Sequence, residues 1–236
     1  TFEFQDLSKI VNLAKKKKIF TFLDNTWGTP LYLKPLKIGF DMSFSSATKY
    51  FSGHSDAMGG SLAVNKKVFK KVMFFYKLSG YRMSADEAYL IIRGLRTLDI
   101  RLEKHYENTK TVINFLKKQK KIKEILYPHN PSTKNYKLWK KYYSGGNGLL
   151  SIVIKSNKKS SVVKFVNSLE LFGIGYSWGG FESLAILQDL RDDTKYTKTR
   201  NYLRFDKNHH IVRLHIGLED PKDLINDLKN SLKYIK

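Results

Sequence analysis

Residues 19–27 have the sequence IFTFLDNTW, and this stretch decides the class of fold. It is a nearly continuous apolar run that ends in polar residues, which is typical of a strand buried in a parallel sheet. Further strands are predicted around residues 38–46 and 60–65, and an amphipathic helix follows at 66–78. Because strands alternate with helices, this half of the chain predicts an α/β fold.

The rest of the chain predicts a second domain of α+β type. A long helical stretch begins with a capping box formed by Ser84 and Glu87. The final helix begins with Asp220 as its cap and Pro221 at its first position. The predicted elements between these helix starts are listed here: helical residues 84–119, strand 149–156, helix 161–172, a loop at 173–184 and strand 209–218. We expect one domain over residues 1–95 and a second over residues 96–236.

Composition limits the class of protein. A chain of 236 residues with 42% hydrophobic residues can bury a sizeable core. No run approaches the roughly 20 apolar residues of a membrane helix, so we expect no membrane partner. The absence of cysteine excludes disulfides, thiolate metal ligands and cysteine nucleophiles, and fits a reducing compartment. The expected location is the cytoplasm.

The formal net charge of +22 raises the question of a nucleic-acid partner. Only eight of the 43 basic residues are arginine, the residue that reads phosphates and guanines with two hydrogen bonds. The lysines occur as short runs on predicted helix faces, such as residues 14–18 and 116–124. We therefore expect solvated surfaces and no nucleic-acid binding.

Asp24 and Lys49 each follow a predicted strand, at the end where functional residues of open α/β sheets collect. Ser46 and Thr48 immediately precede the lysine. A carboxylate, an amine and hydroxyls are the groups that pyridoxal phosphate needs for its ring nitrogen, its covalent attachment and its phosphate. These residues alone do not separate such a site from a phosphate-binding loop, or from a helix cap beside a surface lysine.

Three stretches resemble the signature motifs of the Cys/Met-metabolism family of pyridoxal phosphate-dependent enzymes. They are DNTWGTPLYLKPLKIGFDMSFSSATKYFSGHSDAMGG (24–60), GYSWGGFESL (175–184) and VRLHIGLEDPKDL (212–224). Their order and separation match the family over essentially the whole chain. The resemblance implies the carboxyl-terminal part of a fold type I, aspartate aminotransferase-like large domain, followed by the α+β small domain.

The resemblance also implies a role for each candidate residue. The cofactor would be bound by Lys49, as the Schiff-base lysine, and by Asp24, Ser46 and Thr48. The substrate would be bound by Arg213, through its α-carboxylate, and by Ser177 and Trp178. The residues themselves leave an alternative for Arg213, which could pair with Glu182 or Asp220. His209, His210 and His215 could be considered as a metal site, but no carboxylates at a suitable spacing support them, so we expect a structural or surface role for these histidines.

The motifs are most similar to those of the cystathionine β-lyases within the family. This implies β-elimination of L-cystathionine to homocysteine, pyruvate and ammonia, in methionine biosynthesis, with Lys49 removing the Cα proton. Trp178 in SWGG and the segment RLHIGLED favour this activity, because γ-acting members typically carry SLGG and RLSVGLED. Cystathionine γ-synthase, cystathionine γ-lyase and methionine γ-lyase stay open as alternatives.

The resemblance implies a homo-oligomer, a dimer or tetramer, because the family's active site lies between subunits. Family members usually carry a further amino-terminal region that this sequence does not contain. We therefore expect a fragment, and an inactive truncated chain is a further alternative.

Overall fold

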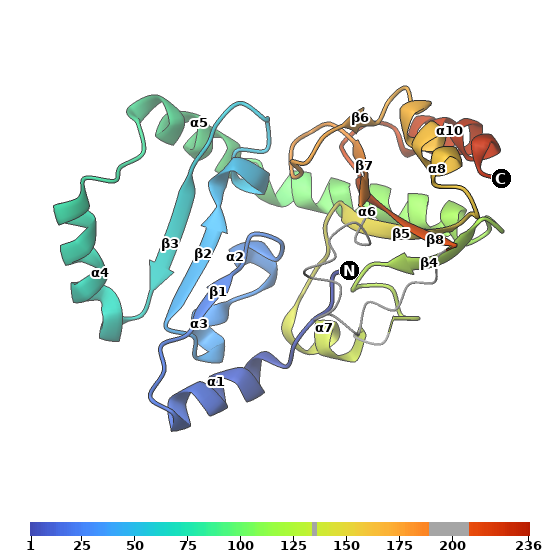
Figure 1. The fold of residues 1–236 in the computed structure, drawn as a ribbon. Coiled ribbons are helices and arrows are strands. Elements are labelled where there is room, and N and C mark those ends of the chain that lie inside the picture. Colours follow the sequence, from blue (N-terminus) through green and yellow to red (C-terminus); the bar gives the residue numbers. More distant parts are fainter. Residues whose placement is uncertain (134–135, 189–207) are drawn as a thin grey trace. The chain divides into compact units, whose positions relative to one another are not determined.

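The structure is a computed structural model that describes residues 1–133, 136–188 and 208–236. The chain divides into two compact units (Figure 1). The amino-terminal unit comprises residues 3–103 and 134–147, and the carboxyl-terminal unit comprises residues 1–2, 104–133 and 148–236. The expected domain boundary at residue 95 stays a prediction.

The amino-terminal unit contains a three-stranded sheet of order β1-β2-β3. The strands are β1 (Phe22–Asp24), β2 (Met42–Ser46) and β3 (Gly60–Val64), with β1 parallel and β3 antiparallel to β2. The helical elements are α1 (Leu7–Lys16), α2 (Thr29–Tyr32), α3 (Pro35–Ile38), η1 (Ala47–Phe51), α4 (Lys66–Ser79), α5 (Ala85–Leu95), the start of α6 (Leu98–Leu116) and α7 (Tyr136–Tyr142).

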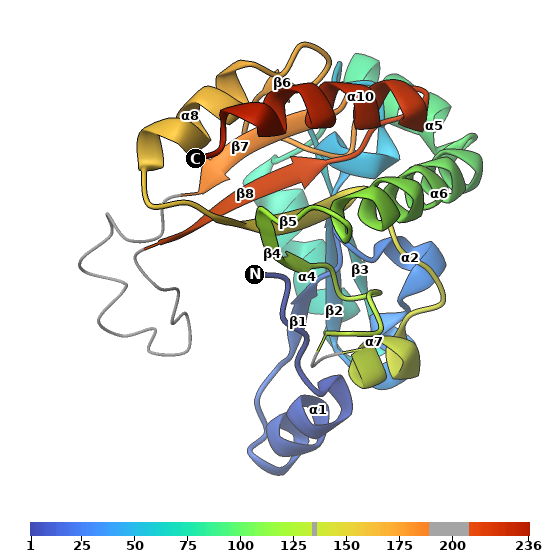
Figure 2. The ribbon, with the colours of Figure 1, turned by 90° about the vertical axis from the view of Figure 1, so that its right-hand side faces the viewer.

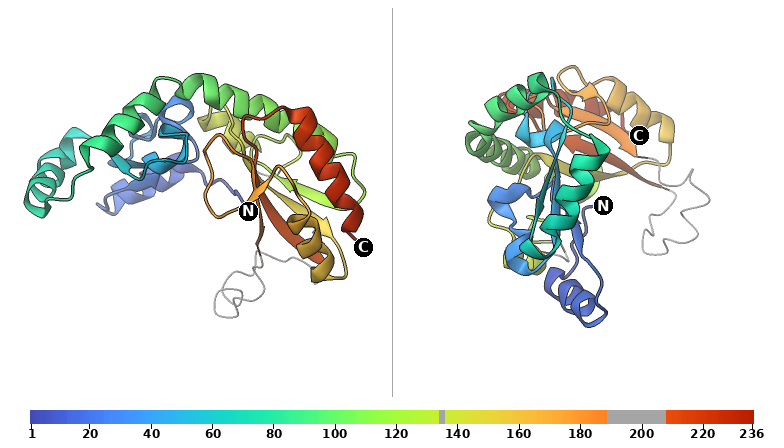
Figure 3. Two further views of the ribbon diagram at one scale, coloured as in Figure 1. Left: turned by 90° about the horizontal axis from the view of Figure 1, so that it is seen from above. Right: turned by 90° about the vertical axis from the view of Figure 1, so that its left-hand side faces the viewer.

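The prediction of a buried strand over residues 19–27 is wrong for most of that stretch. Only Phe22–Asp24 form a strand, and residue Phe22 is 54% exposed. The physical reason is position, since β1 is at one edge of the described sheet and has a single neighbour. β3 forms the other edge and is exposed over most of its length, and α4 lies beyond it (Figures 1 and 3).

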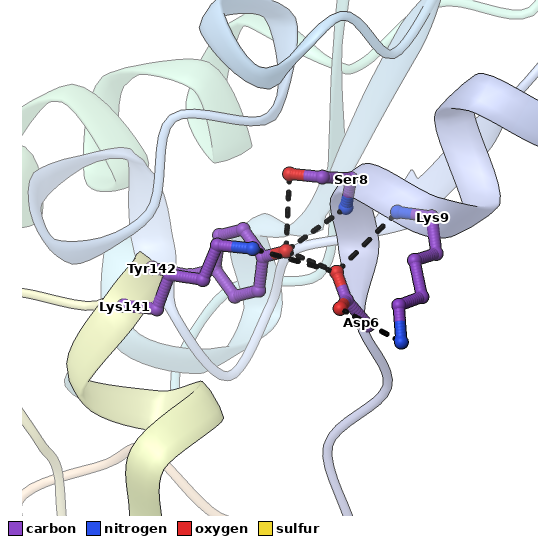
Figure 4. A network of polar contacts seen from close by, with 5 residues as sticks. All are labelled: Asp6, Ser8, Lys9, Lys141 and Tyr142. Carbon is purple, nitrogen blue, oxygen red and sulfur yellow. Dashed lines mark hydrogen bonds and ion pairs between the residues drawn. The ribbon is translucent and has the colours of Figure 1, made fainter.

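Helix α1 is held to this unit by its apolar face and by its first turn. Leu7 and Val11 pack against Leu33 and Phe40, as expected for apolar residues spaced by four. Asp6 caps the helix by accepting a hydrogen bond from the Lys9 amide at 3.3 Å. Figure 4 shows the polar network around this cap, which also contains Ser8, Lys141 and Tyr142.

The carboxyl-terminal unit contains a five-stranded sheet of order β4-β5-β8-β7-β6. Its strands are β4 (Ile122–Leu126), β5 (Leu149–Lys155), β6 (Gly173–Ile174), β7 (Leu184–Gln188) and β8 (His209–His215). All described pairings are antiparallel except β6 with β7. The helical elements are α8 (Lys159–Asn167), α10 (Pro221–Ser231), η2 (Leu232–Tyr234) and the remainder of α6. Figures 1 and 2 show α8 and α10 on the same side of this sheet.

The predicted helix starts are confirmed. The Glu87 amide donates to the Ser84 hydroxyl at 3.2 Å, and this hydroxyl also bonds the Glu87 carboxylate at 3.1 Å. Asp220 accepts from the Lys222 amide at 2.8 Å, with Pro221 in the first turn. Sequence analysis did not identify β4, β7 or α7. No helix in the described residues is both long and apolar enough to cross a bilayer.

Candidate active site

Asp24 ends β1, and its carboxylate is held by Thr26. Asp24 Oδ1 accepts hydrogen bonds from the Thr26 amide at 2.9 Å and from the Thr26 hydroxyl at 2.5 Å. The Thr26 oxygen in turn accepts from the Ser46 amide at 2.8 Å, at the end of β2. Because β1 and β2 are parallel, the carboxyl ends of these two strands lie side by side at one edge of the sheet. Asp24 is exposed there, and its orientation is fixed through Thr26.

Lys49 is in η1, directly after β2, and is half-buried. Its φ of −90° and ψ of −126° are not helical, so the backbone changes direction at this residue. The residues before it are held by Gly59. The Gly59 carbonyl accepts from the Ala47 amide at 2.8 Å, and the Gly59 amide donates to the Thr48 hydroxyl at 3.0 Å.

The donor set fits pyridoxal phosphate. A supported carboxylate can face a protonated ring nitrogen, and a lysine amine can bond the cofactor covalently. The Ser46 hydroxyl makes no hydrogen bond within the described residues, so it can bind a phosphate oxygen. The Thr48 hydroxyl donates to the Gly59 carbonyl at 3.4 Å, so its hydrogen would have to leave that acceptor to reach a phosphate oxygen.

Arg213 lies on β8 in the carboxyl-terminal unit and bonds the loop that carries Ser177 and Trp178. Its Nη2 donates to the Tyr176 carbonyl, and it lies 3.4 Å from the carbonyls of Gly175 and Ser177. Its Nε and Nη1 make no hydrogen bond within the described residues. Burial lowers the pKa of Arg213, and the nearby Tyr176 opposes that shift. The guanidinium thus keeps donors free for a further acceptor, such as a carboxylate.

The alternative partners of Arg213 are not used. In the described part of the chain no ion pair joins it to Glu182 or Asp220. His215, two residues further along the same face of β8, also contacts the loop. Its Nε2 lies 3.1 Å from both the Gly179 amide and the Gly180 carbonyl. Two side chains of one strand face therefore fix this loop.

A family model described as "Cys/Met metabolism PLP-dependent enzyme" matches residues 1–233. The chain belongs to this family. Pyridoxal phosphate is therefore its cofactor class, as the sequence analysis predicted.

Known members of the Cys/Met metabolism family are similar over nearly the whole chain. The chain is 38% identical over 233 residues to an L-alanine/L-glutamate racemase of Wolbachia pipientis wMel, covering 98% of this chain and 57% of the relative. It is 35% identical over 231 residues to cystathionine β-lyase of Escherichia coli strain K12, covering 97% and 58%. The chain thus spans less than two thirds of the length of these relatives.

The solved structure of cystathionine γ-synthase from Xanthomonas oryzae pv. oryzae, in complex with aminoacrylate and cysteine, superposes with a TM-score of 0.87. The sequences are 29% identical, and the match covers 98% of this chain and 60% of the other. The predicted fold type I architecture is confirmed by this likeness.

The predicted site residues of this family member fall into two groups. Asp24, Ser46, Thr48 and Lys49 are in the amino-terminal unit, where Thr26 and Gly59 join their segments. Ser177, Trp178 and Arg213 are in the carboxyl-terminal unit, around one loop. Their roles stay predictions. Sequence analysis missed the supporting residues Thr26 and Arg101, described below, because each bonds a backbone group far along the chain.

Proposed function

We propose that this chain carries the site of a carbon–sulfur lyase that cleaves an amino-acid thioether by β-elimination, with L-cystathionine as its substrate. One observation carries the proposal: Asp24 ends β1 and Lys49 lies just beyond the end of the neighbouring parallel strand β2, in a member of a pyridoxal phosphate-dependent family. The products would be homocysteine, pyruvate and ammonia. Because the chain spans 57–58% of the relatives described above, the proposal applies to the whole gene product that contains it.

Each residue has a defined task in this proposal. When bound, the cofactor supplies an electron sink that stabilises negative charge at the substrate Cα. Lys49 Nζ would hold the cofactor covalently until the substrate amine displaces it, and the freed lysine amine would then take the Cα proton and return a proton to the departing sulfur as the C–S bond breaks. Asp24 keeps the ring nitrogen protonated. The remaining three-carbon fragment takes up water and yields pyruvate and ammonia.

Arg213 is proposed to bind the substrate α-carboxylate. Its Nη2 is already bonded to the loop carbonyls, and this contact fixes the plane of the guanidinium. Nε and Nη1, which make no hydrogen bond within the described residues, can each donate to a carboxylate oxygen. Ser177 and Trp178 would line the same pocket.

Amino-acid racemisation is the second candidate, favoured by the 38% identity to a relative named as a racemase. The chemistry is shorter, because the Cα proton is removed and returned with no leaving group. The same Lys49 and Asp24 would serve. The γ-acting sister enzymes also stay alternatives, because they would use the same Lys49 and Asp24.

The test uses the whole gene product, supplied with pyridoxal phosphate, beside a Lys49→Ala variant. We expect a visible absorption band of bound cofactor that is absent in the variant, with pyruvate and homocysteine formed from L-cystathionine. Cysteine and 2-oxobutyrate would instead indicate γ-elimination, and D-alanine from L-alanine would indicate a racemase. No band in either protein would overturn the cofactor site and favour an inactive chain. The cytoplasmic location and the homo-oligomer stay predictions.

A further inference from the structure

Arg101 is a buried cation at the end of the first turn of α6, in the amino-terminal unit. The residue is only 6% exposed. No ion pair joins it to a carboxylate within the described residues. Burying an unpaired charge is costly unless strong hydrogen bonds compensate. Arginine at this position therefore requires an explanation that packing alone does not supply.

The guanidinium makes three hydrogen bonds to neutral acceptors. Nη1 donates to the Tyr50 carbonyl at 2.9 Å, Nη2 to the Gly94 carbonyl at 2.7 Å and Nε to the Thr97 hydroxyl at 3.1 Å. Gly94 lies in the last turn of α5, where the negative end of the helix dipole favours a cation. The planar group thus links the end of α5 to the residue that follows Lys49.

The backbone after Lys49 closes tightly around this guanidinium. A Cβ atom added at Gly53, whose φ is +68°, would lie 1.9 Å from Arg101 Nη1. A Cβ atom at Gly94 would lie 2.2 Å from the Ser52 carbonyl oxygen. The Lys49 carbonyl accepts from the Gly53 amide at 2.9 Å, so the turn closes on the lysine itself. A displacement of residues 50–53 would move the Lys49 backbone directly.

We propose that Arg101 is a positioning residue for Lys49, which it holds in place through the Tyr50 carbonyl and the end of α5. The proposal rests on the proposed role of Lys49. A lysine side chain has four flexible carbons, so the reach of its Nζ depends on where the backbone places the Cα. A small displacement of a reacting group is enough to cost catalysis by a large factor.

The test compares Arg101→Met with Arg96→Met in the whole gene product. Arg96 is exposed next to the end of α5 and serves as the matched control. We expect Arg101→Met to slow covalent attachment of the cofactor at Lys49 about 10-fold, with a similar loss of kcat and a KM within about twofold of wild type. Attachment is followed by the visible band and by borohydride reduction with mass analysis of the Lys49 peptide. Arg96→Met should match wild type.

Arg101→Lys and Arg101→Ala keep the proposal testable if the methionine variant does not fold. A lysine keeps the charge but cannot bond the Tyr50 and Gly94 carbonyls with a planar fork, so we expect attachment slowed by at least about threefold. Added guanidinium ion should accelerate attachment in Arg101→Ala and leave Arg96→Met unchanged. If Arg101→Met attaches the cofactor at the wild-type rate, or if Arg101→Lys does so where the methionine variant does not fold, the inference about Arg101 is overturned and the proposed function is not. A wild-type protein without a cofactor band would overturn the proposed function, and the inference with it.

Discussion

A single hydroxyl group, that of Thr26, connects the two halves of the candidate cofactor site. It donates to Asp24 and accepts from the Ser46 amide, and Thr26 is itself buried. Thr26→Val keeps the shape of the side chain but leaves the Ser46 amide without this acceptor. We expect about 1–2 kcal/mol lower stability, by chemical denaturation.

The same variant should bind pyridoxal phosphate about 10-fold more weakly, because the Asp24 carboxylate loses one of its two bonds to Thr26. Thr26→Ser keeps the hydroxyl and should restore both properties, and a fluorescence titration with the cofactor measures the second. Wild-type affinity in Thr26→Val would show that Asp24 does not need this support.

His129, in the carboxyl-terminal unit, is a second residue with a measurable consequence. Burial, together with the charge of Lys110, lowers the pKa of His129 to about 4 from its ordinary value of 6.5. Its ring also contacts the Tyr106 hydroxyl, 2.9 Å from Nδ1. Since the folded state binds the proton less tightly than the unfolded state, the stability due to neutral His129 is complete above pH 6.5.

We expect that stability to fall as the pH decreases from about 6.5 to about 4 and then to level off. Carboxylates titrate in part of this range, so the comparison is between wild type and His129→Leu. The difference in their free energies of unfolding should change with pH in this window. A constant difference from pH 7 to pH 4 would contradict the lowered pKa.

What the sequence could predict at the residue scale depended on the separation of the partners. Ser84 and Asp220 were recognised as helix caps because each bonds a backbone amide two or three positions away. Thr26 bonds an amide 20 positions away, and Arg101 a carbonyl 51 positions away. Such partners are known only when the chain is folded, so no local pattern could identify them.

At the scale of elements, α1 and α7 are joined by the network in Figure 4. The Tyr142 hydroxyl donates to the Asp6 carboxylate and accepts from the Ser8 amide at 3.0 Å. This hydrogen bond from Tyr142 lowers the pKa of Asp6, while the Lys141 ammonium lies 3.7 Å from the same carboxylate. An element far along the chain thus stabilises the first turn of α1.

We expect Tyr142→Phe to raise the pKa of Asp6 toward its ordinary value and to speed amide exchange in residues 7–16. Asp6 would then protonate at a higher pH, so the contribution of the cap would be lost earlier as the pH falls. Lys141→Met is the control and should have the smaller effect, because exposed ion pairs contribute little. Nuclear magnetic resonance measures both properties. A larger effect of Lys141→Met would contradict this account.

The strands show that an apolar run in the sequence predicts where a strand forms better than it predicts whether that strand is buried. Residues 149–154 form the buried part of β5, a strand with neighbours on both sides. Residues 19–27 are similarly apolar, yet β1 is short and largely exposed at the edge of its sheet. Composition records that a stretch can be buried, but the neighbouring strands decide whether it is.

Over the whole chain, a high positive charge coexists with exposed apolar side chains. The formal net charge is +22. Four large apolar residues of α4, namely Phe69, Phe74, Phe75 and Leu78, are each more than half exposed. Charge repulsion keeps chains apart, whereas apolar surface of this kind favours association. Salt weakens the first effect over distances beyond about 8 Å at physiological ionic strength and leaves the second intact.

We therefore expect residues 1–236, expressed alone, to self-associate more as the salt concentration rises, measured by sedimentation velocity. A Phe74→Ser, Phe75→Ser double variant should reduce this association, while Leu13→Ser, which changes an exposed leucine of α1, should not. Binding to a nucleic acid would have the opposite dependence, because salt weakens phosphate contacts. A chain that stays monomeric at high salt would show that these side chains are covered. Affinity for DNA that falls steeply with salt would contradict the expectation that the lysines form solvated surfaces.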